Sequence, residues 1–191
     1  MPTSIKSYIN NTIPPVIGKQ TIWIPGYGIN PSSANGAPAS TLAMATSALT
    51  LRTLDFDTTT QEFGEFNILM PKSWNEGQLQ AQFVWSHANT TTNFGVVWAI
   101  QATAWSDGDP LDASWGTETT VADTGGTANT VYITADTGAF TVSPASGSLT
   151  AQEWVTFRVK RNVSDPSDNL AVDARLHGVK LFYTVDASRD D

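Results

Sequence analysis

The stretch FGVVWAIQATAW, residues 94–105, decides the fold of this chain. A period of two is typical of a β-strand, because successive side chains point to opposite faces of the sheet. Here both alternating sets are largely apolar, so we expect a strand that is covered on both faces. One set consists of Phe94, Val96, Trp98, Ile100, Ala102 and Ala104.

Other segments show the same period with one apolar face and one polar face. In residues 154–160, Val155, Phe157 and Val159 alternate with a row that we expect to face solvent. Residues 78–86 likewise alternate apolar residues with glutamine and serine, with Val84 as the exception. The solvent-facing row of residues 154–160 consists of Trp154, Thr156, Arg158 and Lys160. Further strands are predicted at residues 49–55, 62–70, 117–121, 130–134 and 171–185, the last bending at Gly178.

Clusters of Asp, Asn, Gly and Pro separate these segments, as is typical of turns. No region shows a sustained 3.6-residue period, which argues against helices. About eight strands at short spacing therefore predict an all-β fold, an antiparallel two-sheet β-sandwich of jelly-roll-like kind, for residues 49–191.

The first 48 residues differ from this body. They hold five prolines from Pro14 to Pro38, a density that disfavours helices and long strand ladders. Their apolar residues are too few to close a core, so we expect an extended N-terminal arm over residues 1–48 that docks on another surface. The side chains predicted to bind that partner are Ile22, Trp23, Ile24 and Tyr27.

Composition excludes several classes of protein. The chain has 191 residues, and 10 Lys plus Arg against 18 Asp plus Glu give a net charge of -8. Such a charge disfavours nucleic acid and anionic membranes as partners. The absence of cysteine excludes disulfides and thiolate metal sites. No apolar run reaches the roughly 18 to 20 residues of a membrane span, so we expect synthesis in the cytosol and a soluble product until assembly.

The sequence offers little support for catalysis or cofactor binding. His87 and His177 could bind a metal with Asp173, but residues four apart in a strand are separated by roughly 13 Å. Glu62 and Glu65 are three apart and are expected on opposite faces, the wrong geometry for a glycosidase pair. We therefore predict a protein that is not an enzyme, with no catalytic residue, no cofactor and no metal site.

The segment 106–112 is the best alternative metal candidate, because it holds three carboxylates at a spacing typical of calcium loops. It lacks the downstream glutamate and the flanking helices of an EF-hand. Because Asp and Gly also form ordinary turns, we interpret the segment as a turn.

Seven tryptophans are many for this length. Trp85 and Trp98 lie on the most apolar strand faces and are predicted to be core residues. Trp154 shares its face with charged residues and is expected to be exposed. An exposed aromatic platform would bind sugars, with Trp154 and Trp115 as its residues, whereas buried tryptophans would serve the core or a subunit interface, the interpretation we favour.

Six segments of the chain together carry a family pattern. They are KQTIWIP (19–25), LRTLDFD (51–57), MPKSW (70–74), NFGVVW (93–98), residues 106–117 with Asp-Pro-Leu-Asp and Trp-Gly, and AVDARLHGVKL (171–181). In these segments the chain resembles small virion structural proteins of tailed bacteriophages, especially phages of marine proteobacteria. The resemblance extends from about residue 20 to residue 185.

The resemblance implies a structural role in a virion and assigns no active site. The expected function is a capsid decoration or cement protein that binds the capsid surface through its arm. The expected partners are copies of itself, as a trimer, and other virion proteins such as the major capsid protein. The alternative is a head or tail fibre component that binds a carbohydrate receptor, for example a host surface glycan.

Overall fold

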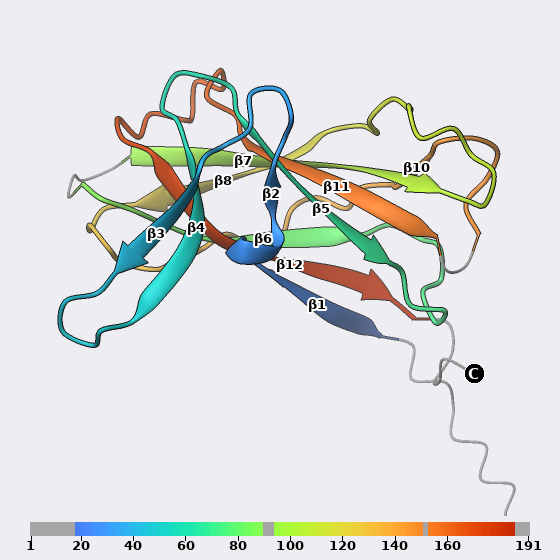
Figure 1. Cartoon of the computed structure of the whole chain (residues 1–191), viewed down its shortest axis with the longest axis horizontal. Helices are drawn as coiled ribbons and strands as arrows, with labels where there is room; N and C mark the ends of the chain where they lie inside the picture. Colours follow the sequence, from blue (N-terminus) through green and yellow to red (C-terminus); the bar gives the residue numbers. More distant parts are fainter. Residues whose placement is uncertain (1–17, 90–93, 151–152, 186–191) are drawn as a thin grey trace, which may run out of the picture.

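The computed structural model describes residues 18–89, 94–150 and 153–185, which form two packed β-sheets (Figure 1). In chain order the elements are β1 (Lys19–Pro25), the 3-10 helix η1 (Gly26–Gly28), β2 (Asn30–Pro31), β3 (Ala39–Ala43), β4 (Thr50–Phe56), β5 (Phe63–Leu69), β6 (Gln80–His87), β7 (Phe94–Trp105), β8 (Thr119–Gly125), β9 (Tyr132–Ile133), β10 (Ser143–Pro144), β11 (Trp154–Arg161) and β12 (Ala174–Thr184).

The first sheet has the strand order β3-β4-β12-β6-β9, and β1 joins it along β12. The second sheet has the order β10-β7-β11-β5-β2, and β8 pairs with β7. The ladders between these strands are antiparallel, except for the short parallel ladder between β10 and β7. The predicted all-β, two-sheet antiparallel sandwich of jelly-roll-like kind is therefore confirmed.

The strand predicted from residues 94–105 has those bounds in the structure, as β7. Its inner set lies in the core, and Val97, Ala99 and Thr103 of the outer set are also buried. Loops cover this outer side: the backbone N–H of Val97 donates to Asp168, and the hydroxyl of Thr103 donates to the carbonyl of Ser114. Both faces of β7 are thus covered, as its sequence predicts.

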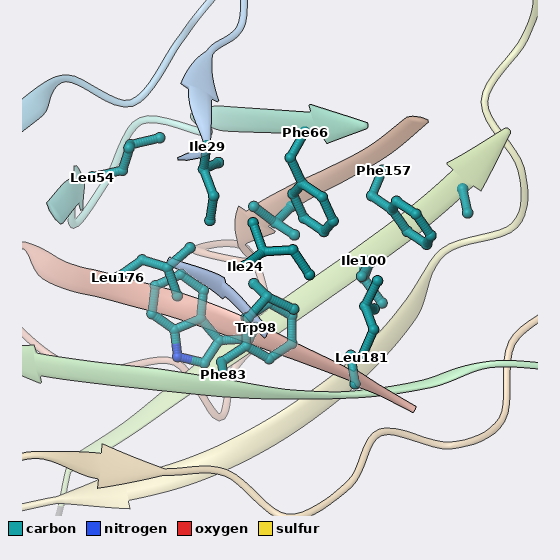
Figure 2. Close-up of a cluster of buried hydrophobic side chains, with 14 of the residues drawn as sticks. Ile24, Ile29, Leu54, Phe66, Phe83, Trp98, Ile100, Phe157, Leu176 and Leu181 are labelled. Atoms are coloured by element: carbon teal, nitrogen blue, oxygen red, sulfur yellow. The ribbon is translucent and has the colours of Figure 1, made fainter. Parts of the chain in front are cut away.

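Aromatic and aliphatic side chains fill the space between the sheets (Figure 2). Trp98 of β7 stacks on Phe83 of β6 with ring centroids 5.4 Å apart and meets the edge of Phe56 at 5.2 Å. Such pairs contribute beyond the area that they bury. Trp85 and Trp98 are fully buried, which confirms their prediction as core residues.

The described part of the predicted arm differs from the expected extended segment. Over seven residues β1 pairs with β12, from Lys19 opposite Thr184 to Pro25 opposite Gly178. β2 pairs with β5, and β3 pairs with β4. The ladder of β12 satisfies the backbone of β1, so this segment folds into the sandwich although it has few apolar residues. Residues 1–17 lie outside the described residues, and for them the arm stays a prediction.

The prolines of this region stand where a strand tolerates them. Pro25 and Pro31 are the last residues of β1 and β2, so neither interrupts the middle of a ladder. Directly after Pro25 the chain passes close to β4 and β12. A Cβ on Gly26 would lie 2.7 Å from the carbonyl oxygen of Arg52, so only glycine permits this approach.

The bend predicted at Gly178 is present. The ladder between β12 and β6 shifts its register between Leu176 and Gly178, as at a β-bulge. The ring of Trp23 lies over Gly178 and leaves no room for a Cβ there. Trp23 is thereby fixed on the outer side of the first sheet, while its neighbour Ile24 points into the core.

A buried ion pair fastens the loop between β11 and β12 to the sandwich. Arg161 is 1% exposed, and its Nη2 donates to Asp168 at 2.7 Å. The same guanidinium also donates to the carbonyls of Leu170 and Val172. Asp168 in turn accepts the backbone N–H of Val97 on β7. One cation therefore holds the 162–173 loop against the central strand.

Replacing Arg161 with alanine should lower the free energy of unfolding by about 3 to 5 kcal/mol, because it leaves the buried carboxylate of Asp168 without its counter-ion and removes the donor to the carbonyls of Leu170 and Val172. Urea unfolding followed by tryptophan fluorescence measures this loss. Arg52→Ala is the matched control, since Arg52 is exposed, and should change stability by no more than about 0.5 kcal/mol. Equal losses in the two variants would show that Arg161 has no special role.

Candidate functional site

The outer face of the β7-β11-β5 sheet combines aromatic, polar and charged side chains. Because Val155, Phe157 and Val159 of β11 point inward, their neighbours must point outward. Strand register sets these neighbours in rows across the sheet. The rows are Leu69–Trp154–Trp105, Asn67–Thr156–Thr103, Glu65–Arg158–Gln101 and Phe63–Lys160–Ala99.

A pocket of about 490 Å³ lies at the Trp154 end of this face. The strand ends supply Leu69, Trp105 and Trp154, and the two adjoining loops supply the remaining wall. We call this cavity the Trp105–Trp154 pocket. Its loop residues are Ser106, Asp107, Gly108, Asp109, Leu111, Thr150 and Glu153.

Two indole rings form one side of the pocket. The ring centroids of Trp105 and Trp154 are 5.4 Å apart, with an angle of 43° between the ring planes. The indole N–H of Trp105 donates to the carbonyl of Pro110 at 3.0 Å, which fixes that ring. Trp154 is 39% exposed, which agrees with its predicted solvent-facing position, and Leu69 is 67% exposed.

The loop residues of the pocket wall are acidic and polar, and they are hydrogen-bonded to one another. Oε1 of Glu153 accepts bonds from the hydroxyl of Ser106 and from the backbone N–H and hydroxyl of Thr150, at 2.7 to 2.8 Å. Asp109 closes the 106–109 turn by accepting the backbone N–H of Ser106 at 2.9 Å. These bonds hold the loops at the mouth of the pocket in a defined shape.

Further along the face, Arg158 organises a second aromatic group. Its guanidinium lies 4.6 Å from the ring centroids of both Trp115 and Phe63, and it donates to Gln101 at 2.7 Å. Burial lowers the pKa of Arg158, while Glu65 and Glu118 oppose this shift. Because an arginine pKa is so high, the group remains a cation. Trp115 is thus held beside the sheet and is half-buried.

The four residues predicted to bind a partner lie around β1. Ile24 is 7% exposed and belongs to the core, and Ile22 is half-buried against it. Trp23 and Tyr27 are 49% and 73% exposed. Ile24 and Ile22 therefore contact their own sandwich, whereas partner binding by Trp23 and Tyr27 stays a prediction.

The two histidines point to opposite sides of the first sheet. His87 lies in an aromatic group, 4.6 Å from Phe94 and 5.5 Å from Tyr132 between ring centroids. Nε2 of His177 lies 2.8 Å from the hydroxyl of Ser86 on the outer side. The structure therefore does not bring the histidines together with Asp173 as metal ligands.

The contact between Ser86 and His177 has the residue types of a nucleophile and its base. Ser86 is only 2% exposed, so a substrate has no access to its hydroxyl in this structure. Neither residue lines the pockets at the outer face, η1, the β12 end or Asp173. The pair is best explained as a hydrogen bond that stabilises the bulge of β12.

The carboxylates considered for catalysis or metal binding have other contacts. Glu62 accepts the backbone N–H of Asp57, and burial raises its pKa. Glu65 accepts the hydroxyl of Ser32 at 2.5 Å on the outer face. Backbone N–H groups of Thr60 and Thr59 lower the pKa of Asp57 to about 2. Within residues 18–89, 94–150 and 153–185, no group of three His, Cys, Asp or Glu side chains is placed to hold a metal ion.

The sequence suggests Trp154 and Trp115 as residues of a sugar platform, the alternative that we did not favour. The pocket includes Trp154 but not Trp115, and the sequence gives no sign that Trp105, Leu69 and Glu153 join Trp154 in one cavity. Trp105 belongs to the outer set of its strand, so the period of two gives its direction. It does not give its neighbour. Trp105 stands opposite Trp154 because the ladder between β7 and β11 pairs residues that are 49 positions apart in the sequence.

Comparisons with known proteins give no family. No family model matches the chain, and no curated protein matches its sequence. Among solved structures, the xylan-binding module CBM15 is similar with 14% identity and a TM-score of 0.47, over 90% of this chain and 100% of that chain. A family 11 carbohydrate-binding module from Clostridium thermocellum, in complex with a β-1,3-1,4-mixed-linked tetrasaccharide, is similar with 10% identity and a TM-score of 0.44. The match covers 84% of this chain and 94% of that chain.

At these identities and TM-scores, the likeness is no basis for assigning a shared ligand.

Within the described residues, no helix has the length and apolar character needed to cross a membrane.

Burial is the main cause that lowers the pKa of His87 below 6.5. Because the unfolded chain binds the proton more readily, stability should fall as the pH drops below about 6.5. His177 contributes in the same direction, since its pKa is also lowered by burial. Replacing His87 with leucine should reduce this pH dependence, as measured by urea unfolding between pH 7.5 and 5. An unchanged slope would contradict the buried, neutral state of His87.

Proposed function

We propose that this chain is a non-enzymatic glycan-binding protein whose binding site is the Trp105–Trp154 pocket. The observation that supports this most directly is the paired indole rings beside hydrogen-bonding side chains in one exposed cavity. A sugar ring has an apolar face of C–H groups and an edge of hydroxyls. Aromatic rings suit the first surface, and carboxylates and hydroxyls suit the second.

The construction of the pocket supports binding without a large conformational change. Trp105 and Trp154 project from paired strands, and the indole of Trp105 is fixed by the carbonyl of Pro110. A site on a rigid sheet loses little conformational entropy when the ligand arrives. The outer face continues from the pocket along β11 towards Thr156 and Arg158, which provides a surface for further sugar units.

The non-catalytic part of the proposal rests on the same pocket. Of its acidic groups, Glu153 is 3% exposed and its Oε1 is engaged by Ser106 and Thr150. Asp109 is likewise engaged in its own turn. Asp107 is the third acidic residue of the lining, and the two engaged carboxylates leave it without a second free carboxylate to form an acid–base pair, so the proposal assigns all three to hydrogen bonding.

Replacing Trp154 with alanine should weaken glycan binding by at least about tenfold, as expected for an aromatic residue at the centre of a site. A glycan array first identifies the best neutral ligand, and isothermal titration calorimetry then measures the affinity. Trp105→Ala should have a similar effect. Both variants should keep a cooperative thermal transition, because Trp154 is partly exposed and Trp105 lies on the outer face.

Trp23→Ala is the matched control, since Trp23 is also an exposed tryptophan but lies on the other sheet. It should leave glycan affinity unchanged. If no glycan on the array binds the unaltered protein, or if Trp23→Ala weakens binding as much as Trp154→Ala, the proposed site is wrong.

A second proposal is attachment within a bacteriophage particle through the surface around β1, as in a capsid decoration or fibre protein. It is supported by the exposure of Trp23 and Tyr27 on consecutive elements. Among the described strands, β1 pairs with β12 alone, so its other edge is open to a further strand. The partner proposed is another copy of this chain, or the capsid surface.

The variant Trp23→Ala/Tyr27→Ala should then shift the protein towards the monomer, because both side chains would lie in the contact between copies. Size-exclusion chromatography with light scattering measures the mass of the full chain and of the variant. A monomeric unaltered protein, or an oligomer that the double substitution does not change, would contradict this contact.

A further inference from the structure

The ionisable side chains on the wall of the Trp105–Trp154 pocket all have the same sign. They are Asp107, Asp109 and Glu153, and the described wall contains no Lys, Arg or His. The nearest cation on β11, Arg158, is four residues from Trp154, or roughly 13 Å along the strand. Lys160 lies further away and pairs with Glu118 at 2.6 Å. None of the three ion pairs found within residues 18–89, 94–150 and 153–185 includes Asp107, Asp109 or Glu153.

The polar atoms of the wall also favour a ligand that brings hydrogen-bond donors. Ionised carboxylates only accept hydrogen bonds. Oε1 of Glu153 is saturated by Ser106 and Thr150, whereas Oε2 is buried and has no partner in the described part of the chain. A buried acceptor without a partner costs free energy, and it adds an unpaired acceptor to the acidic wall of the pocket.

Resting on the proposed glycan binding, we infer that the Trp105–Trp154 pocket selects glycans rich in hydroxyl and amino donors and rejects glycans that carry carboxylate or sulfate groups. A neutral or amino sugar can stack on Trp154 and donate to Asp107 or Asp109. An acidic group in the same place meets three like charges and offers them no proton. The discrimination comes as much from this repulsion as from the attraction of donors.

The net charge of the whole chain strengthens this preference, but the charges of the pocket wall create it. The chain as a whole has a net charge of -8, which repels anionic glycans at long range. At about 0.15 M salt, charges further apart than roughly 8 Å are largely screened. A preference set by the pocket wall persists in such salt, whereas a preference set only by net charge would largely disappear.

A glycan array with matched pairs tests the inference. The pairs share a backbone and differ in an acidic group: cellulose with carboxymethyl cellulose, chitosan with carboxymethyl chitosan, and neutral galactan with its sulfated form. At about 0.15 M salt, the neutral or amino member of each pair that binds should bind at least about tenfold more tightly than the acidic member. Acidic members that bind as tightly would overturn the inference while leaving glycan binding intact. Absence of binding by every member would instead refute the proposed function and the inference with it.

The variant Asp107→Asn/Asp109→Asn separates the pocket wall from the overall charge. It should raise the ratio of acidic to neutral affinity at least about threefold. The control Glu76→Gln/Asp136→Asn changes the net charge equally with exposed residues that do not line the pocket, and it should leave the ratio unchanged. Equal ratios in the two variants, or an effect only in the control, would overturn the assignment of selectivity to the pocket.

Discussion

The pleat of β11 is the constraint on which the rest of this structure depends. Val155, Phe157 and Val159 must point inward to close the core, and the alternation then forces Trp154, Thr156, Arg158 and Lys160 outward. A slip of one residue would place Trp154 in the core and expose Phe157, so burial holds the register firmly. The same register sets Trp154 opposite Trp105. Stability and the candidate site therefore depend on one strand pairing.

The loops at the two ends of β11 complete the pocket and stabilise the sandwich. The outer face of the sheet supplies aromatic rings, while Ser106, Asp109, Thr150 and Glu153 supply a wall of mutually bonded polar groups. At the opposite end of β11, Arg161 and Asp168 fasten the next loop to β7. Each end of β11 thus anchors a loop, one for stability and one for the proposed recognition of glycans. The proposed hydrogen-bonding groups thus lie on loops that a rigid sheet holds in position, as is common for binding sites.

Local patterns in the sequence predict the strands and their faces well. The bounds of β7, the outward row of β11 and the bend at Gly178 all follow from alternation and glycine chemistry. The place of β1 does not follow, because its ladder depends on the long β12 leaving an edge beside β4. The prolines of that region indicate an arm, yet Pro25 stands at a strand end and interrupts nothing. The pocket is missed for a related reason: periodicity gives the direction of a side chain but not its neighbour across the sheet.

The most direct measurement is an NMR titration that follows the indole N–H signals of the seven tryptophans while the best glycan from an array is added. Assignment comes from single Trp→Phe variants. The account predicts saturable shifts for Trp105 and Trp154, with Trp23 and the buried Trp85 and Trp98 unaffected. Shifts centred on Trp23, or none at Trp105 and Trp154 while the glycan binds, would contradict it.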